Sequence, residues 1–401
     1  MALTPEQVQT IRSSVPILQE HGNAITTSFY ATLLKEAPAL HNVFNHNNQA
    51  NGHQAATLES ALVAYASYID DLGALSPAIE KICHKHASLY VRPERYELVG
   101  QYLLRAMGDV LGSALTIDIL NAWGAAYSQL ADLMIQREEQ LLDSANGWVD
   151  WRDFRISDKV KESEEITSLY LEPVDGQRLP SFLPGQYVSI QTNVPQLQLL
   201  QSRQFSLSDA PHPAYYRISV RKNHCGCISK ILHEETAIGD VLKVSYPHGE
   251  FFLDRQQDKD SPIVLLSAGV GLTPVISILN SLTMHDSERY ISFIHGSRDS
   301  ASRAFHSHVR KKALRHPNIK HITFLTAPDA DHDTQGRCYN YAGRLDLGKL
   351  DSTSELLLGH KQTQYFLCGP NDFITDVTRG LEGMGVELSR IKSEMFGAGL
   401  P

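Results

Sequence analysis

Residues 266–274 (LSAGVGLTP) form the segment whose composition points most directly to chemistry. They follow a short apolar run, residues 263–266, which predicts a buried strand, and an apparent helix comes after them. Glycine at positions 269 and 271 allows the backbone to approach a pyrophosphate closely where such a helix begins. The segment therefore predicts a dinucleotide site formed by six consecutive residues, namely Gly269, Val270, Gly271, Leu272, Thr273 and Pro274. A tight turn without a ligand is the alternative.

Two histidines, His84 and His86, are candidates for metal ligands. On a helix, residues two apart point to nearly opposite faces, so one metal ion cannot bind both side chains. Ile79, Ile82 and Cys83 precede His86 by seven, four and three residues, which puts His86 on the apolar face and His84 on the solvent-facing side. A histidine on an apolar helix face is more often a core residue than a ligand, so the helical phase alone leaves both possibilities open.

The cysteines, the charge and the hydropathy pattern narrow the class of protein. No C-x-x-C pair occurs among the five cysteines, which favours reduced thiols over a zinc ribbon or a thioredoxin-type site: Cys83, Cys225, Cys227, Cys338 and Cys368. The net charge of -9 argues against a nucleic-acid partner. The first residues, MALTPEQVQTIRSS, are polar and do not resemble a signal peptide, and no apolar run is long enough for a membrane helix. We therefore expect a cytoplasmic protein with no stable membrane insertion.

The elements that must position these residues change in type along the chain. A length of 401 residues is too great for one compact core. Residues 1–140 predict an all-α unit, in which Thr4, Pro5 and Gln7 are typical of a capped helix start and Ile117 to Met134 continues an apolar helix face. Residues 141–151 suit a linker, residues 152–256 predict short strands in a small antiparallel barrel, and residues 262–401 predict an α/β domain with a parallel sheet.

This order of domains, together with several motifs, resembles the flavohaemoglobin family, in which a globin is fused to a ferredoxin-reductase-like module. KHASL resembles the proximal haem segment of the family, which implies haem b with His86 as the axial ligand and Lys85 in the haem pocket. The matching positions in PERYELVG and IQREEQ are Tyr96 and Glu138. The resemblance implies that they fix the imidazole and make it more electron-donating. A core tyrosine and a solvated carboxylate are the alternatives.

The other side of the implied haem pocket also follows from the resemblance. FYATLL resembles the segment that places a tyrosine over bound O2, here Tyr30, whose hydroxyl could polarise dioxygen. VFN supplies Phe44, which resembles the globin phenylalanine that stacks on the haem. QANGHQAATLESAL resembles the distal helix and implies Gln54 and Leu58 as its facing residues. Each residue alone also suits a helical core, so their order and spacing carry the resemblance.

The FAD site is implied by three motifs between residues 184 and 229. The stretch RQFS resembles the R-x-Y-S/T flavin motif and consists of Arg203, Gln204, Phe205 and Ser206, with Phe205 in place of the usual tyrosine. PGQY implies that Tyr187 lies against FAD. CGCIS stands in the place of a G-G-x-V/I-S loop that leads into a helix holding the pyrophosphate, which implies Gly226 and Ser229. Cys225 occupies a position where glycine is common.

Two motifs near the C-terminus complete the reductase. CGP, consisting of Cys368, Gly369 and Pro370, resembles the family segment that lies near the nicotinamide. EMFG, consisting of Glu394, Met395, Phe396 and Gly397, resembles the E-x-F-G ending whose aromatic ring covers the flavin. The following AGLP departs from the common continuation. Arg298, in an HGSR stretch after the second predicted parallel strand, suits either the phosphate of NADPH or solvent.

The resemblance implies a nitric oxide dioxygenase. Hydride passes from NADH or NADPH to FAD, electrons pass singly to the haem, and NO reacts there with O2 to give nitrate. The expected partners are small molecules, namely NO, O2 and NAD(P)H, and we expect a monomer. Two other functions stay open: a haem-based sensor or carrier of O2 or NO, and an NAD(P)H reductase for other acceptors such as peroxides or quinones.

Overall fold

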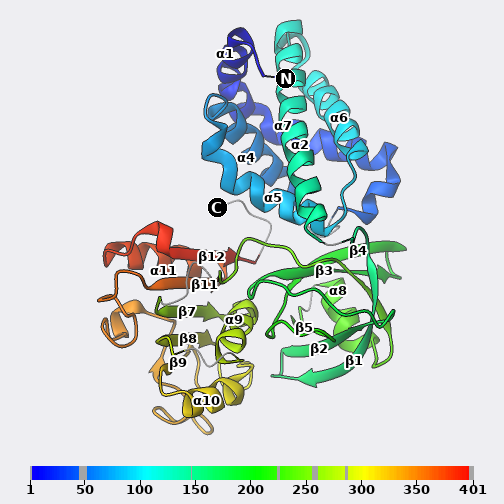
Figure 1. The fold of residues 1–401 in the computed structure, drawn as a ribbon. Coiled ribbons are helices and arrows are strands. Elements are labelled where there is room, and N and C mark those ends of the chain that lie inside the picture. Colours follow the sequence, from blue (N-terminus) through cyan, green and yellow to red (C-terminus); the bar gives the residue numbers. More distant parts are fainter. Residues whose placement is uncertain are drawn as a thin grey trace. The chain divides into compact units, whose positions relative to one another are not determined.

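The computed structural model describes residues 2–44, 52–145, 147–223, 226–254, 261–284 and 288–396. The chain forms two compact units. Among the described residues, one contains those up to 152 together with 189–203, and the other contains 153–188 and 204–396. The helices, the antiparallel strands and the parallel strands follow one another along the chain, and Figure 1 shows the ribbon of each part.

The first part of the chain is helical throughout. The hydroxyl of Thr4 accepts a hydrogen bond from the backbone N–H of Gln7, and the Gln7 side chain accepts one from Thr4 N–H, so the predicted capping box is present. Short 3-10 turns separate several of the helices. The helices are α1 (Pro5–Ser13), α2 (Val15–Glu36), α4 (His53–Ser67), α5 (Ser76–Ser88), α6 (Glu94–Leu111) and α7 (Ile117–Asp143).

The helical core follows most of the predicted apolar faces. Leu62 and Tyr65 of α4 are buried, and their spacing of three residues puts them on one face of the helix. Trp123 of α7 is also buried, and its indole N–H donates to Ser14 Oγ at 3.1 Å. The prediction was wrong for Ile117, which is 65% exposed because it is the first residue of α7 and has no helix turn before it to pack with.

The second part is an antiparallel sheet with strand order β4-β3-β6-β1-β2-β5. A bridge between Leu207, just after β4, and Ile218 of β5 joins the two outer strands of this order. The predicted antiparallel fold is therefore confirmed, although the hydropathy pattern alone did not indicate β4 or β6. The strands are β1 (Arg152–Lys161), β2 (Ile166–Pro173), β3 (Tyr187–Val194), β4 (Leu199–Ser206), β5 (Tyr216–Arg221) and β6 (Val241–Val244).

The third part is a parallel sheet with strand order β10-β9-β8-β7-β11-β12 (Figure 1). Ile263 and Leu265 of β7 face α9 and α10, whereas Val264 and Leu266 face α11 on the other side. The strands are β7 (Ile263–Ala268), β8 (Ile291–Ser297), β9 (Ile319–Leu325), β10 (Tyr341–Ala342), β11 (Gln364–Gly369) and β12 (Ile391–Met395), and the helices are α9 (Leu272–Met284), α10 (His306–Arg315) and α11 (Asn371–Gly383).

The predicted fold class, an all-α part followed by an antiparallel sheet and a parallel α/β part, is confirmed. The predicted domain boundaries at residues 140, 152, 256 and 262 stay predictions. Within the described part of the chain, every helix is too short or too polar to cross a membrane.

Candidate functional site

The imidazole of His86 is held by two side chains from other helices. His86 lies in the last turn of α5, and its Nδ1 is 2.8 Å from the Tyr96 hydroxyl of α6 and 3.0 Å from Glu138 Oε1 of α7. The Tyr96 hydroxyl also donates a short hydrogen bond to Glu138 Oε1. Glu138 is only 4% exposed, so it is a buried carboxylate and not a solvated helix charge. Three helices therefore bring these predicted residues together.

This arrangement fixes the chemical form of the His86 ring. Because Glu138 Oε1 accepts hydrogen bonds from its surroundings, His86 Nδ1 carries the proton and Nε2 keeps its lone pair. Burial, followed by the charge of Glu138, raises the pKa of Tyr96, so this residue is a neutral hydrogen-bond donor. His86 Nε2 has no hydrogen-bond partner among the described residues. The ring is therefore suited to act as an axial haem ligand through Nε2.

The structure corrects the prediction that His84 faces solvent. The side chain of His84 is only 12% exposed, and its Nε2 lies 3.4 Å from Glu80 Oε1. Glu80 is in turn ion-paired with Arg137 of α7. Burial lowers the pKa of His84. The prediction was wrong because α7, more than fifty residues along the chain, covers this side of α5 with an ion pair that the helical phase of α5 cannot indicate.

Sequence reasoning also missed the residue that positions Tyr96. The Tyr127 hydroxyl of α7 donates to the Tyr96 carbonyl oxygen at 2.6 Å. A Cβ atom at Gly100 would lie 2.4 Å from the Tyr127 ring, so glycine is required where this ring crosses α6. Gly100 could have indicated this contact from the sequence, because glycine is unfavourable inside a helix unless another group approaches its backbone closely.

Four residues predicted for the opposite side of the haem pocket lie in one apolar cluster or bind to it. Tyr30 is buried, and its ring meets the ring of Phe44 at a centroid distance of 5.6 Å in a T-shaped arrangement. A side-chain hydrogen bond joins Tyr30 to Gln54, and Leu58 packs against the same cluster. Burial raises the pKa of Tyr30, which keeps its O–H as a donor at neutral pH.

Lys85 follows His84 on α5 but has different surroundings. Burial of its ammonium group, followed by the positive charges of Lys81 and Arg203, lowers the pKa of Lys85. Much of the residue is nevertheless exposed. Because its neighbours are also positively charged, the Lys85 ammonium group is suited to form an ion pair with an anionic group, such as a haem propionate.

The predicted glycine-rich turn joins β7 to α9 and directly contacts the end of β11. Gly269 has a φ of +56°, a conformation that glycine adopts at no steric cost. A Cβ atom at Gly271 would lie 2.1 Å from the carbonyl oxygen of Cys368, so only glycine fits at this position. The turn and the CGP segment, nearly one hundred residues apart in sequence, therefore meet at the carboxyl ends of neighbouring parallel strands, where open α/β sheets bind nucleotides.

The remaining residues of these two motifs are mostly buried. Leu272, Thr273 and Pro274 form the first turn of α9, and the Thr273 hydroxyl donates to the Val270 carbonyl oxygen at 3.1 Å. Cys368 is fully buried, and this burial raises the pKa of its thiol. The thiol is therefore uncharged at neutral pH. Gly369 ends β11, and Pro370 is the N-cap residue of α11.

The predicted FAD residues lie on β3 and β4. Tyr187 is the first residue of β3, and a Cβ atom at Gly249 would lie 2.9 Å from its ring, so glycine fits beside the ring where a larger residue would clash with it. The RQFS motif forms the end of β4, and Arg203 NH1 donates to the Ser202 carbonyl oxygen at 2.7 Å. The four residues of the motif occupy consecutive strand positions, namely Arg203, Gln204, Phe205 and Ser206.

The loop before α8 (Cys227–Lys230) is closed by Ser229. Its hydroxyl accepts a hydrogen bond from Asn223 N–H at 3.1 Å and lies 3.2 Å from the Gly226 carbonyl oxygen. The predicted helix at this place is a single α-turn that continues into a π-turn, Ile231–Glu235. Cys225, the departure from the motif, lies outside the described residues.

The C-terminal motif begins in β12, where Glu394 and Met395 pair with Cys368 and Gly369 of β11. Phe396 is 39% exposed, and Gly397 lies outside the described residues. The HGSR stretch was expected to follow a strand, but its first three residues belong to β8. Arg298, which does follow β8, is ion-paired with Glu165 and Asp299, each at 2.9 Å.

Comparison with known proteins assigns the helical part and the parallel α/β part to known families. The globin family matches residues 27–134, and the oxidoreductase NAD-binding domain family matches residues 265–379. A flavohemoprotein of Bordetella parapertussis is 44% identical and covers 99% of this chain and 99% of its own length. A flavohemoprotein of Deinococcus radiodurans is 41% identical, with 98% of this chain and 97% of its own length covered.

Solved structures agree with this similarity. The crystal structure of a flavohemoglobin from Malassezia yamatoensis, with bound FAD and heme, matches with a TM-score of 0.88 at 28% identity and covers 99% of this chain and 100% of its own. The FAD/NAD-binding domain of a nitric oxide dioxygenase from Vibrio cholerae matches with a TM-score of 0.55 at 29% identity, covering 62% of this chain and 99% of its own.

Fold, site and similarity together define an NAD(P)H oxidoreductase in which a haem-binding globin is joined to an FAD- and nicotinamide-binding reductase. The chain belongs to the flavohemoprotein family. Its cofactors are haem, FAD and NAD(P)H.

Proposed function

We propose that the chain is a nitric oxide dioxygenase that converts NO and O2 to nitrate with NAD(P)H as the electron donor. The observation that supports this most is the contact of His86 Nδ1 with both Tyr96 and Glu138, because an electron-rich imidazole suits activation of O2 better than its storage. The Vibrio cholerae protein whose reductase domain matches this chain is itself named a nitric oxide dioxygenase. The reaction balances with two NO, two O2 and one NAD(P)H giving two nitrate ions, one NAD(P)+ and one proton.

The helical part holds and orients the reactants in this proposal. His86 would hold the haem iron through Nε2, while Tyr96 and Glu138 keep the proton on Nδ1. When bound, haem supplies the iron at which O2 reacts with NO, and FAD divides the two electrons of a hydride into single transfers. Tyr30 supplies a neutral O–H that hydrogen-bonds to dioxygen, and its contacts with Gln54 and Phe44 fix its position.

The reductase part places the two redox groups in this proposal. The turn around Gly269 and Gly271 holds the pyrophosphate of NAD(P)H against the N-terminus of α9. Cys368, kept uncharged by its burial, lines the nicotinamide site. The proposed FAD contacts are Tyr187, Arg203, Gln204, Phe205, Ser206, Gly226, Ser229 and the C-terminal motif from Glu394.

The test is whether NAD(P)H oxidation requires both gases. With purified protein, NADH or NADPH should be consumed rapidly only when NO and O2 are both present, and nitrate should form at two molecules per NAD(P)H. A sensor or carrier would bind these gases without sustained NAD(P)H consumption. Rapid consumption with a peroxide or a quinone, and slow consumption with NO and O2, would favour the alternative reductase function.

Two neighbouring histidines provide a matched pair of variants. His86→Ala should abolish NO removal but leave NAD(P)H-driven reduction of ferricyanide largely intact, because that reaction needs only the flavin. His84→Ala removes a partly buried histidine two residues away and should keep haem binding and NO removal. If NO removal survived in His86→Ala, or were lost in both variants, the assigned role of His86 would be wrong.

We further propose that the protein works in the cytoplasm as a monomer on small molecules. Four cysteines in the described part of the chain, Cys83, Cys227, Cys338 and Cys368, form no disulfide bond, which suits a reducing compartment. Gel filtration with light scattering would test the monomer.

A further inference from the structure

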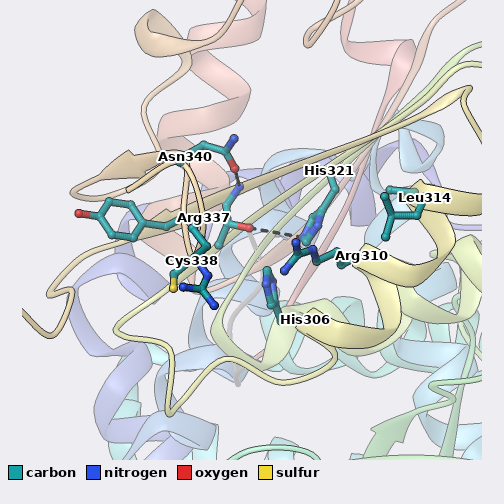
Figure 2. Close-up of a pocket in the computed structure, with 11 residues that line it drawn as sticks. His306, Arg310, Leu314, His321, Arg337, Cys338 and Asn340 are labelled. Carbon is teal, nitrogen blue, oxygen red and sulfur yellow. Dashed lines mark hydrogen bonds between the residues drawn. The ribbon is translucent and has the colours of Figure 1, made fainter. Parts of the chain in front are cut away.

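A pocket with a volume of about 390 Å³ lies on the nicotinamide-binding part of the chain. Its wall comes from α10, from β9 and from the segment 336–340, and Figure 2 shows the side chains around it. No residue of this wall belongs to the glycine-rich turn or to the CGP segment. The volume falls in the range of small-molecule sites, roughly 300–1,000 Å³. The pocket is therefore large enough for a ligand and is built from residues that the proposed function does not use.

Two guanidinium groups lining the pocket are without anionic partners. Arg310 of α10 and Arg337 of the segment 336–340 make neither an ion pair nor a side-chain hydrogen bond with any residue that the structure describes. Figure 2 shows these two side chains on either side of the His306 ring. Arg303, which precedes α10, is bonded instead to the Cys338 carbonyl oxygen at 2.5 Å. The wall thus presents two guanidinium groups whose N–H donors have no partner among the described residues. A guanidinium group can donate two parallel hydrogen bonds to two oxygens of one carboxylate or phosphate.

Two imidazoles line the space near these cations. The rings of His306 and His321 are 5.2 Å apart, and His321 Nε2 lies 3.4 Å from the Thr323 hydroxyl. His306 Nδ1 is buried and has no hydrogen-bond partner among the described residues. Buried polar atoms are nearly always bonded in native proteins, so an unpaired one in the wall of a pocket points to a group that the described protein atoms do not supply. These histidines lack the ligand set of a metal site in the described part of the chain.

An apolar surface adjoins the polar groups. Ala313 and Leu314 of α10 line the pocket, and Leu314 is 79% exposed, which is unusual for a large apolar side chain. A bare inorganic ion would leave this surface in water. A ligand with an anionic group and an apolar or aromatic body would cover it.

We propose that this pocket binds a phosphomonoester, with the phosphate between Arg310 and Arg337 and its organic body over Ala313 and Leu314. A phosphate dianion matches the two guanidinium charges, and its three terminal oxygens can also accept hydrogen bonds from the imidazoles. The inference does not depend on the proposed reaction with NO. It assigns this part of the chain a second, separate ligand site.

The surroundings of the two imidazoles lower the pKa of each ring. Burial, followed by the charges of Arg303 and Arg310, lowers the pKa of His306 to about 4, and burial, followed by His306, Arg303, His295 and Arg310, lowers the pKa of His321 to about 3. Both rings are therefore neutral at pH 7 without a ligand. A bound dianion favours their charged forms, so its binding raises the pKa of both rings. The charged and titratable groups around the two rings are Arg303, Arg310, Arg337, His295 and Cys338. The negative charge of Asp333 favours the charged form of Arg303.

The test is a calorimetric titration of the full-length protein, loaded with haem and FAD, using phenyl phosphate as the probe. Arg310→Gln and Arg337→Gln should each weaken binding about tenfold or more, as expected for losing charge-assisted hydrogen bonds. Arg315→Gln is the matched control, because it removes the same charge from the same helix but does not line the pocket. Binding in this control should stay within about twofold of the wild type, since an exposed charge that does not contact the ligand is screened by solvent and salt.

Further titrations separate the sources of phosphate. Phenol should not bind, and inorganic phosphate should bind more weakly than phenyl phosphate. Equal affinity for inorganic phosphate would overturn the organic part of the proposal. Phenyl phosphate should also leave NADH-driven ferricyanide reduction unchanged. Competition with NADH, unchanged binding in both pocket variants, or equal weakening in Arg315→Gln would overturn the assignment of the pocket as a separate phosphomonoester site.

Discussion

Replacing Gly271 with alanine should impair the reductase through a clash between two backbone segments. The added Cβ atom would lie 2.1 Å from the Cys368 carbonyl oxygen and 2.7 Å from Gly369 N. An ordinary carbon–oxygen contact is about 3.3 Å, so the shortfall is about 1.2 Å. Because both neighbours are backbone atoms, no side-chain rotation can relieve it. The turn after β7 and the end of β11 must therefore move apart by about 1 Å.

The size of the effect follows from this displacement. Forcing an extra carbon into a packed site costs about 1–3 kcal/mol of stability. A shift of about 1 Å in a group that positions substrate can cost about a hundredfold in rate. We therefore expect Gly271→Ala to lower kcat/KM for NAD(P)H-driven ferricyanide reduction by about a hundredfold. The haem spectrum should be unchanged, because the substitution lies outside the globin.

Two other glycines serve as controls. Gly359→Ala adds a Cβ atom with no neighbour within 4 Å and should behave as the wild type. Gly269→Ala also meets no atom within 4 Å but has a φ of +56°, so it should cost about 1–2 kcal/mol through backbone strain alone. If Gly271→Ala kept kcat/KM within threefold of the Gly359→Ala variant, the close approach of the two segments would not matter for nucleotide binding.

Three further predictions concern other buried groups. Tyr96→Phe removes the hydroxyl 2.8 Å from His86 Nδ1 and should slow NO consumption about tenfold while ferricyanide reduction is unchanged; an unaltered NO rate would show that Glu138 alone suffices. Tyr30→Phe should lower the NO rate about tenfold or more, measured with an NO electrode, and a rate equal to that of the wild type would contradict its role as a donor. Burial, followed by Arg303, lowers the pKa of His295 to about 3, so its stabilising effect is complete above about pH 6.5 and is lost at about 1.4 kcal/mol per unit as the pH falls toward 3. His295→Gln should flatten the acid side of the unfolding profile, and an unchanged slope would show that other groups dominate.

The fold was predictable where the sequence pattern is local. Residues 263–266 predict β7 because four consecutive apolar residues suit a strand covered on both faces. The hydropathy pattern missed β4 because its sequence, LLQSRQFS, is largely polar and lacks alternation, and four of its inner positions, residues 202–205, are only partly buried. β6 has alternating burial, but its four residues are too few for a pattern to be distinguished from a loop.

The site was predictable only in part, for a different physical reason. The helical phase of α5 separates His86 from His84, but it cannot show that Arg137 and Glu80 bury His84. The meeting of Gly271 with Cys368 depends on the order of strands in the sheet, which no local pattern specifies. Long-range contacts therefore account for the errors, and the roles assigned to the individual site residues stay predictions that the variants above can test.

The central claim is that electrons pass within one chain from NAD(P)H through FAD to the haem held by His86. The most direct measurement is a visible spectrum of the purified oxidised protein after addition of NADH or NADPH under CO without O2. The flavin absorbance should fall and the band of a reduced carbonyl haem should appear, and this band should be missing in His86→Ala. Bleaching of the flavin without any carbonyl-haem band in the wild type would show that electrons do not pass from the flavin to the haem.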